Sequence, residues 1–157
     1  MTSPLTDPGS PFSHHPVPPT DRPAPGAAAA GEPQARVRVE KPWGHEEIFA
    51  ILEGRYVGKV LHIRAGAALS LQRHLLKEET LAVQSGRITV EHGPDQRNLQ
   101  TLTLEPGQQI LLPARVVHRV RALADSEIIE VSTAWPGWRT DVERLDDGYG
   151  RTGTTTP

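Results

Sequence analysis

Two histidines and a glutamate are the residues of this sequence whose types and spacing could do chemistry. His74 and Glu79 lie close together, and His118 follows later in the chain. If two strands bring them together, two imidazoles and a carboxylate would suit a divalent metal ion such as Zn, Mn or Fe. The residues alone leave two other interpretations open. The histidines could line a barrel and make hydrogen bonds without a metal, and Glu79 could be a general base or a surface residue.

A row of polar side chains leads to His74. If the segment is a strand, Ser70, Gln72 and His74 point to one face, and Leu69 and Leu71 point to the other. Such a row belongs either on the solvent side of a sheet or inside a barrel that holds a polar ligand.

Short strands are the elements that must position these residues. Runs rich in Val, Ile, Leu and Thr alternate with Gly, Pro, Asn and Asp, which predicts an all-β sandwich or barrel. The predicted strands are 46–52, 57–64, 69–74, 80–84, 87–92, 99–104, 109–112, 117–122 and 127–133. No helix longer than a turn or two is expected among them.

Composition limits the domain organisation and the function. Residues 1–35 are rich in proline and have no apolar periodicity, so we expect a disordered tail there, then a barrel domain over 36–151 and a disordered C-terminus over 152–157. The net charge of −2 argues against a nucleic-acid or anionic-membrane partner. The absence of cysteine excludes disulfides and thiol catalysis, and no apolar run is long enough for a membrane helix. A cytoplasmic protein is the expectation.

Several motifs resemble those of a known superfamily. Six residues separate Glu79 from Gly86, and a Pro-x-x-x-x-His run ends at His118, which is similar to the two motifs of the cupins. Three further runs resemble the cupin domain of type II mannose-6-phosphate isomerases: Lys41-Pro42-Trp43-Gly44, the run from Gly66 to Gln72, and the run from Arg144 to Arg151.

The resemblance implies a fold, an activity and a set of roles. The fold would be a cupin-type double-stranded β-helix, or jelly roll, and the reaction would be aldose–ketose isomerisation of mannose 6-phosphate. His74, Glu79 and His118 would be the metal ligands, with Zn, Mn or Fe as the cofactor. Either Lys59 or Glu79 would carry the proton. Gln72, Arg144 and Arg151 would bind a sugar phosphate, because guanidinium groups suit phosphate.

Two departures from the family pattern keep alternatives open. Leu76 stands where the family has a second histidine, and by alternation we expect it on the same strand face as His74, which predicts a weak or absent metal site. Arg115 replaces the glycine of the second motif. One alternative function is therefore a non-catalytic cupin that binds a sugar or a nucleotide-linked sugar, and another is a metal-dependent dioxygenase. A homodimer is a further alternative to a monomer.

Overall fold

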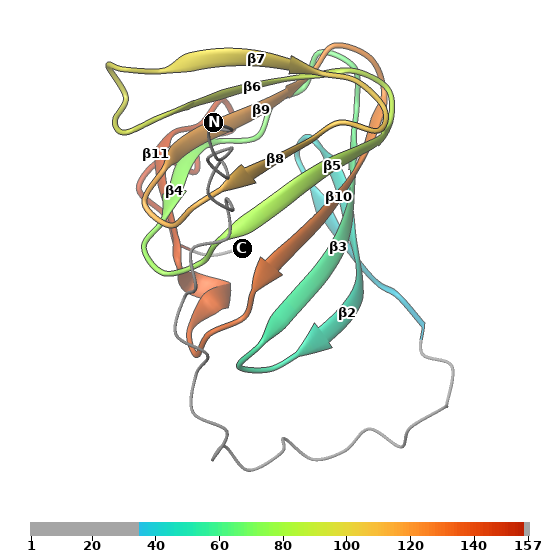
Figure 1. The fold of residues 1–157 in the computed structure, drawn as a ribbon, viewed down its shortest axis with the longest axis vertical. Helices are drawn as coiled ribbons and strands as arrows, with labels where there is room; N and C mark the ends of the chain where they lie inside the picture. The colour runs from blue at the N-terminus through green and yellow to red at the C-terminus, as the bar shows by residue number, and fades with distance from the viewer. Residues whose placement is uncertain (1–34, 156–157) are drawn as a thin grey trace, which may run out of the picture. The chain divides into compact units, whose positions relative to one another are not determined.

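The computed structural model describes residues 35–155, and this part of the chain forms two antiparallel sheets that face each other (Figure 1). The first sheet has the strand order β1-β2-β3-β10-β5-β8, and the second has the order β11-β4-β9-β6-β7. The strands are β1 (Val37–Lys41), β2 (Gly44–Leu52), β3 (Tyr56–Ile63), β4 (Leu71–His74), β5 (Glu79–Ser85), β6 (Ile88–Gly93), β7 (Gln100–Leu104), β8 (Gln109–Leu112), β9 (Val117–Ala122), β10 (Ser126–Thr133) and β11 (Val142–Asp146).

Strands distant in sequence are paired, as a jelly roll requires. β10 lies between β3 and β5, and β9 lies between β4 and β6 (Figure 1). The double-stranded β-helix expected from the sequence is therefore confirmed. Within residues 35–155 the one helical element is a single 3₁₀ turn, Trp138–Thr140, and no helix has the length and apolar character to span a membrane.

The core forms because apolar residues alternate along the strands and point between the sheets. Its buried members come from both sheets: Trp43, Leu61, Ile63, Leu81, Val83, Ile88, Val90, Leu104, Leu112, Val120, Ala122 and Ile128. The β5–β6 turn depends on Gly86, which has a positive φ of 82°. A Cβ atom there would lie 2.3 Å from the Asp125 carbonyl oxygen, so this turn requires glycine.

Each of the nine strands predicted from the sequence is present, with ends shifted by at most two residues. β1 and β11, at the edges of the two sheets, were not predicted. The expected N-terminal tail lies outside the described residues except for its last residue, Ala35. Of the expected disordered C-terminus, residues 152–155 are described, and Gly153 and Thr154 hydrogen bond with Arg144.

Candidate functional site

The polar row that leads to His74 faces the inside of the barrel. Ser70, Gln72 and His74 all line one cavity, and the Ser70 hydroxyl donates a hydrogen bond of 2.7 Å to Gln72. Gln72 pairs with Arg144 of β11 on one side and with His118 of β9 on the other. β4 therefore lies between β11, which carries Arg144, and β9, which carries His118.

The three expected metal ligands come together in the barrel interior. His118 Nε2 lies 2.8 Å from Glu79 Oε1, and His74 Nε2 lies 3.6 Å from Glu79 Oε2. All three side chains are buried, and each offers a ligand atom within 4.8 Å of the others.

Backbone carbonyls fix the orientation of both imidazoles. Nδ1 of His74 lies 3.0 Å from the Asp141 carbonyl, and Nδ1 of His118 lies 3.0 Å from that of Val116. Because a carbonyl oxygen only accepts, each Nδ1 is the donor, and in the neutral ring the lone pair is on Nε2. Both Nε2 atoms are buried and lie toward the Glu79 carboxylate, His118 at 2.8 Å and His74 at 3.6 Å. This is the arrangement by which metal-binding histidines are oriented, so the residues fit a divalent ion.

A buried ammonium group shares the carboxylate of this site. Lys77 Nζ lies 2.7 Å from Glu79 Oε2 and 3.0 Å from Glu130 Oε1, and the Lys77 side chain is 7% exposed. A metal that used Glu79 would therefore share its only carboxylate ligand in this triad with a lysine.

Lys77 belongs to a row of alternating charges that continues along the inner face of the first sheet. Lys59 lies 4.0 Å from Glu130 and 3.2 Å from Glu46, and Lys41 lies 3.4 Å from Glu46 on its other side. With Glu79, the row holds three lysines and three glutamates, so it is neutral when all are ionised. Such a buried network keeps its charges because each is paired.

Burial and neighbouring charges shift several pKa values in this region. Burial, with the charge of Lys77, lowers the pKa of His74 to about 4, so the ring is neutral at pH 7. Burial opposes ionisation of Glu79, but the charge of Lys77 and the contact with His118 hold the pKa of that carboxyl well below its usual range. Burial likewise opposes ionisation of Lys77, whose pKa is nevertheless raised by Glu130 and Glu79.

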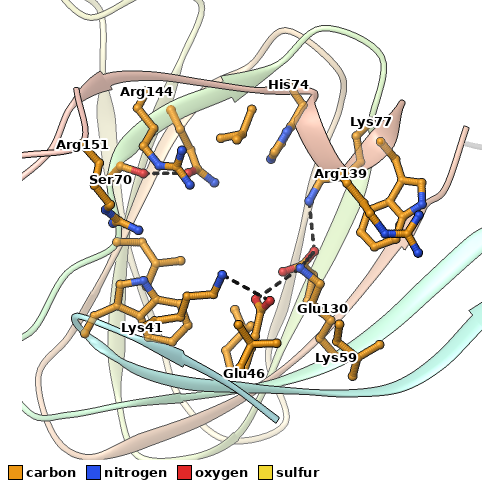
Figure 2. A pocket seen from close by; sticks show the side chains of 18 residues that line it. Lys41, Glu46, Lys59, Ser70, His74, Lys77, Glu130, Arg139, Arg144 and Arg151 are labelled. Atoms are coloured by element: carbon orange, nitrogen blue, oxygen red, sulfur yellow. Dashed lines mark hydrogen bonds and ion pairs between the residues drawn. The ribbon is translucent and has the colours of Figure 1, made fainter. Parts of the chain in front are cut away.

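The cavity in front of the triad has a volume of about 260 Å³. His74, Lys77 and Glu130 line it, whereas Glu79 and His118 are behind its wall. Figure 2 shows Arg144 and Arg151 on one side of this cavity and Lys77 and Glu130 on the opposite side. The cavity is lined by six cationic side chains and two carboxylates: Lys41, Lys59, Lys77, Arg139, Arg144 and Arg151, with Glu46 and Glu130.

The side opposite Lys77 presents two guanidinium groups. Arg144 is buried, and its Nη1 donates to the hydroxyl of Thr154 at 3.0 Å. Arg151 makes two hydrogen bonds to the Asp147 carboxylate, of 2.8 and 3.1 Å. Burial and the Arg151 charge both lower the pKa of Arg144, although Asp147 opposes them. An anion between the two guanidinium groups would relieve this unfavourable charge environment.

Aromatic rings complete the lining. Trp138, in the 3₁₀ turn, lines the cavity with Arg139 stacked on it at 4.3 Å, and Trp43 lines it from the core. Four residues of the lining and the charged row were not predicted from the sequence: Glu46, Lys77, Glu130 and Trp138. For Glu46 and Glu130 the available signal was alternation along their strands, but alternation does not show which strands pair. Lys77 and Trp138 lie outside the strands, so alternation gave no signal for them.

The other predicted site residues lie together. Lys59, Gln72, Arg144 and Arg151 line the same cavity. Two arginines of the motif strands lie outside it: Arg73 pairs with Glu143, and Arg119 pairs with Glu91 and Asp146.

The expectation for Leu76 was wrong. β4 ends at His74, and Leu76, beyond that end, is 59% exposed, so it does not share the face of His74.

Arg115 adopts the left-handed conformation, with φ of 70°, that the glycine of the motif would adopt without strain. Its amide donates a 2.6 Å hydrogen bond to the His74 carbonyl, which ties the loop before His118 to the end of β4.

Comparison with known proteins gives a sequence family. The family described as mannose-6-phosphate isomerase C-terminal matches residues 29–147. The alginate biosynthesis protein AlgA of Pseudomonas putida is 35% identical over 125 residues, which cover 78% of this chain and 24% of AlgA. The chain thus spans about a quarter of the length of this relative.

Solved structures with similar folds have little sequence identity to this chain. KdgF from Halomonas sp. has a TM-score of 0.55 and 18% identity, over 66% of this chain and 94% of KdgF. Oxalate decarboxylase from Bacillus subtilis has a TM-score of 0.61 and 13% identity, over 70% of this chain and 30% of the decarboxylase. At this identity the likeness concerns the fold alone, which is that of the cupins.

Proposed function

The chain belongs to the family of mannose-6-phosphate isomerase C-terminal domains, and from this premise we propose that its pocket interconverts mannose 6-phosphate and fructose 6-phosphate. The observation that carries the proposal is a cavity with two guanidinium groups on one side and His74, of the His/Glu/His triad, in another part of its lining. The name of the alginate biosynthesis relative supports a place in polysaccharide metabolism. The cytoplasmic location and the homodimer stay predictions.

Arg144 and Arg151 are the proposed anchor of the 6-phosphate. Guanidinium groups bind phosphate through paired hydrogen bonds, and this pair lies across the cavity from Lys77 and Glu130 (Figure 2). A phosphate held there would direct the rest of a hexose toward the lysine–glutamate row, with Gln72 as a hydrogen-bond partner for its hydroxyls.

The size of the cavity favours a monosaccharide phosphate over a nucleotide-linked sugar. Its volume of about 260 Å³ is just below the ~300–1,000 Å³ typical of small-molecule sites. The indoles of Trp43 and Trp138 offer apolar faces to a sugar ring.

His74, Glu79 and His118 would hold a divalent ion, which when bound would act as a Lewis acid on the carbonyl and hydroxyl at C1 and C2 of the sugar. Glu79 is behind the cavity wall, so we assign it the role of ligand rather than proton carrier. Lys59 faces the cavity between Glu46 and Glu130, with its Nζ 3.2 Å from Glu46 and 4.0 Å from Glu130. These three groups are the proposed carriers of the proton between C1 and C2. Lys59 and Lys77 lower the pKa of Glu130 against the effect of burial, so its carboxylate is ionised and able to accept a proton.

A non-catalytic sugar-phosphate-binding cupin is the second candidate, and the contact of Lys77 with Glu79 favours it. The ammonium occupies one oxygen of the triad's carboxylate at 2.7 Å, which weakens the case for a tightly held metal. A coupled assay for fructose 6-phosphate, run with added Zn²⁺, Mn²⁺ or Fe²⁺, separates the two functions. Turnover of mannose 6-phosphate supports the isomerase, and binding without turnover supports the binder.

Binding itself is tested by thermal denaturation with mannose 6-phosphate and with mannose. Only the phosphorylated sugar should raise the melting temperature, because a ligand that binds the native state stabilises it. Arg144→Gln should abolish this shift. Arg73→Gln is the matched control, because Arg73 is on the neighbouring strand and pairs with Glu143 outside the cavity. A shift that survives Arg144→Gln, or one that mannose also gives, would contradict the proposed phosphate anchor.

A further inference from the structure

A second group of histidines and glutamates lies on the opposite face of the first sheet. His45 of β2 and His62 of β3 are cross-strand partners, and Glu127 of β10 is the partner of His62 on its other side. β2, β3 and β10 are adjacent strands, as Figure 1 shows. The next residues along the strands, Glu46 and Leu61, face the barrel interior, so the histidines project from the outer surface.

The two rings and the carboxylate of Glu47 are close enough to share one ion. The ring centroids of His45 and His62 are 4.2 Å apart. Glu47, two residues after His45 on the same face, joins them, and each of the three offers a ligand atom within 4.8 Å of the others. Ligand atoms around a tetrahedral zinc ion lie about 3.3 Å apart for bonds of ~2.0–2.1 Å. Small side-chain rotations therefore suffice to bring the three donors together.

His62 already has the partners that orient a metal-binding histidine. Its Nδ1 lies 3.4 Å from Glu127 Oε1, and its Nε2 lies 3.8 Å from Glu47 Oε2. That Nε2 is buried, and within the described part of the chain it has no hydrogen-bond partner. A carboxylate on one ring nitrogen and a metal on the other is the usual carboxylate–histidine–zinc arrangement.

The surrounding charges permit a cation at this position. Glu40, Glu47 and Glu127 lie around the ring pair, and Arg38 pairs with Glu40 at 2.6 Å. Arg36 contacts Glu47 at 2.8 Å, with 58% of its side chain exposed. Exposed ion pairs of this kind contribute only about 0–1 kcal/mol, so a metal could displace Arg36 from Glu47 at little cost.

We propose that His45, His62 and Glu47 form a transition-metal site on the outer face of the barrel, with Glu127 orienting His62. Two imidazoles and a carboxylate suit Zn²⁺, with water as the fourth ligand. The site is separate from the barrel triad and does not depend on the proposed isomerase function. A bound ion would link β2 to β3, the strands whose inner faces carry Glu46 and Lys59.

Calorimetric titration of Zn²⁺ into the full chain tests the proposal. His45→Ala should remove one equivalent of bound Zn²⁺ or lower the affinity for that equivalent by at least about tenfold. Loss of even a residue that only orients a ligand lowers metal affinity by ~10–100-fold. The imidazole NMR signals of His62 should shift with Zn²⁺ in the natural protein and not in His45→Ala. A double variant, His14→Ala/His15→Ala, should keep the full stoichiometry, which shows that the adjacent histidines outside the described residues are not the site.

A second variant, with a smaller structural change, separates loss of the metal site from loss of stability. Glu47→Gln keeps the shape of the side chain and should also weaken binding. Glu143→Gln is its matched control, because this glutamate also pairs with a strand arginine, Arg73, but lies away from the cluster. Melting curves without metal verify that each variant is folded. The proposal is overturned if His45→Ala and Glu47→Gln bind Zn²⁺ as the natural protein does, or if His14→Ala/His15→Ala removes the equivalent instead.

Discussion

Lys77 should limit the affinity of the barrel triad for a divalent metal. Its ammonium lies 2.7 Å from Glu79 and 3.0 Å from Glu130, and the three side chains are buried. A metal ion that binds Glu79 must compete with this ammonium for the carboxylate. We expect the double variant Lys77→Met/Glu130→Gln to bind Zn²⁺ or Mn²⁺ more tightly than the natural protein. Removing one positive and one negative charge together keeps the row neutral, and Glu79 keeps His118 as a partner at 2.8 Å.

The size of the effect follows from the contact that is lost. A hydrogen bond to a charged group contributes about 1.5–3 kcal/mol net. Because each ~1.4 kcal/mol is a factor of ten in a binding constant, removal of the competing ammonium should tighten metal binding by about 10- to 100-fold.

Calorimetric titration in a His45→Ala background measures this constant without a contribution from the outer histidine pair. The matched control is Lys59→Met/Glu130→Gln, which removes the same charges from the same row. Lys59 contacts Glu46 and Glu130, so the control leaves Lys77 on Glu79. If the Lys77 variant binds no more tightly than the control, Lys77 does not compete with the metal and the reasoning fails.

Three further predictions concern single positions. Burial, with the Lys77 charge, lowers the pKa of His74 in the folded state to about 4, from about 6.5 for a free histidine. The unfolded state therefore takes up this proton first on acidification, and metal-free protein should lose roughly 3 kcal/mol of unfolding free energy between pH 6.5 and 4. Urea denaturation across that pH range measures this loss. If the unfolding free energy of His74→Asn falls with pH as steeply as that of the natural protein, the prediction is wrong. Leu76→His should leave the metal affinity unchanged in the same calorimetric assay, because the side chain at 76 points to solvent; tighter binding would show that it can reach the triad. Arg115→Gly should raise the melting temperature by a few degrees, since a non-glycine residue in the left-handed region costs about 1 kcal/mol or more. A lower melting temperature would mean that contacts of the arginine outweigh this strain.

Period-two alternation was enough to predict the strands of the core, but not every strand at the sheet edges. β11 was missed because its inward positions include Arg144 as well as Val142, so its buried face is not apolar in sequence. The arginine is at an inward position because that part of the barrel is a polar cavity. The same feature that makes the strand a functional candidate therefore removes the hydrophobic signal that would predict it.

The triad was predictable, whereas the charged row beside it was not. His74, Glu79 and His118 belong to two motifs whose spacing is visible in the chain. Lys59 and Glu130, by contrast, are direct cross-strand partners on β3 and β10, which are far apart in sequence and paired only through the jelly-roll order. When the strand order is unknown, the sequence cannot distinguish a buried lysine–glutamate pair on two strands from two solvated surface residues.

The error at Leu76 has a specific structural cause. Alternation was extended past His74, but the carboxylate of Asp141 accepts the backbone amides of Leu75, Leu76 and Lys77, at 2.7 to 3.1 Å, and ends the strand there. The chain turns at that point, so Leu76 points to solvent and Lys77 enters the barrel to contact Glu79. A single acidic residue more than sixty positions away thus decides which side chain approaches the triad. In place of the expected second histidine, the barrel receives an ammonium group, which cannot donate a lone pair but can neutralise the carboxylate that a metal would need.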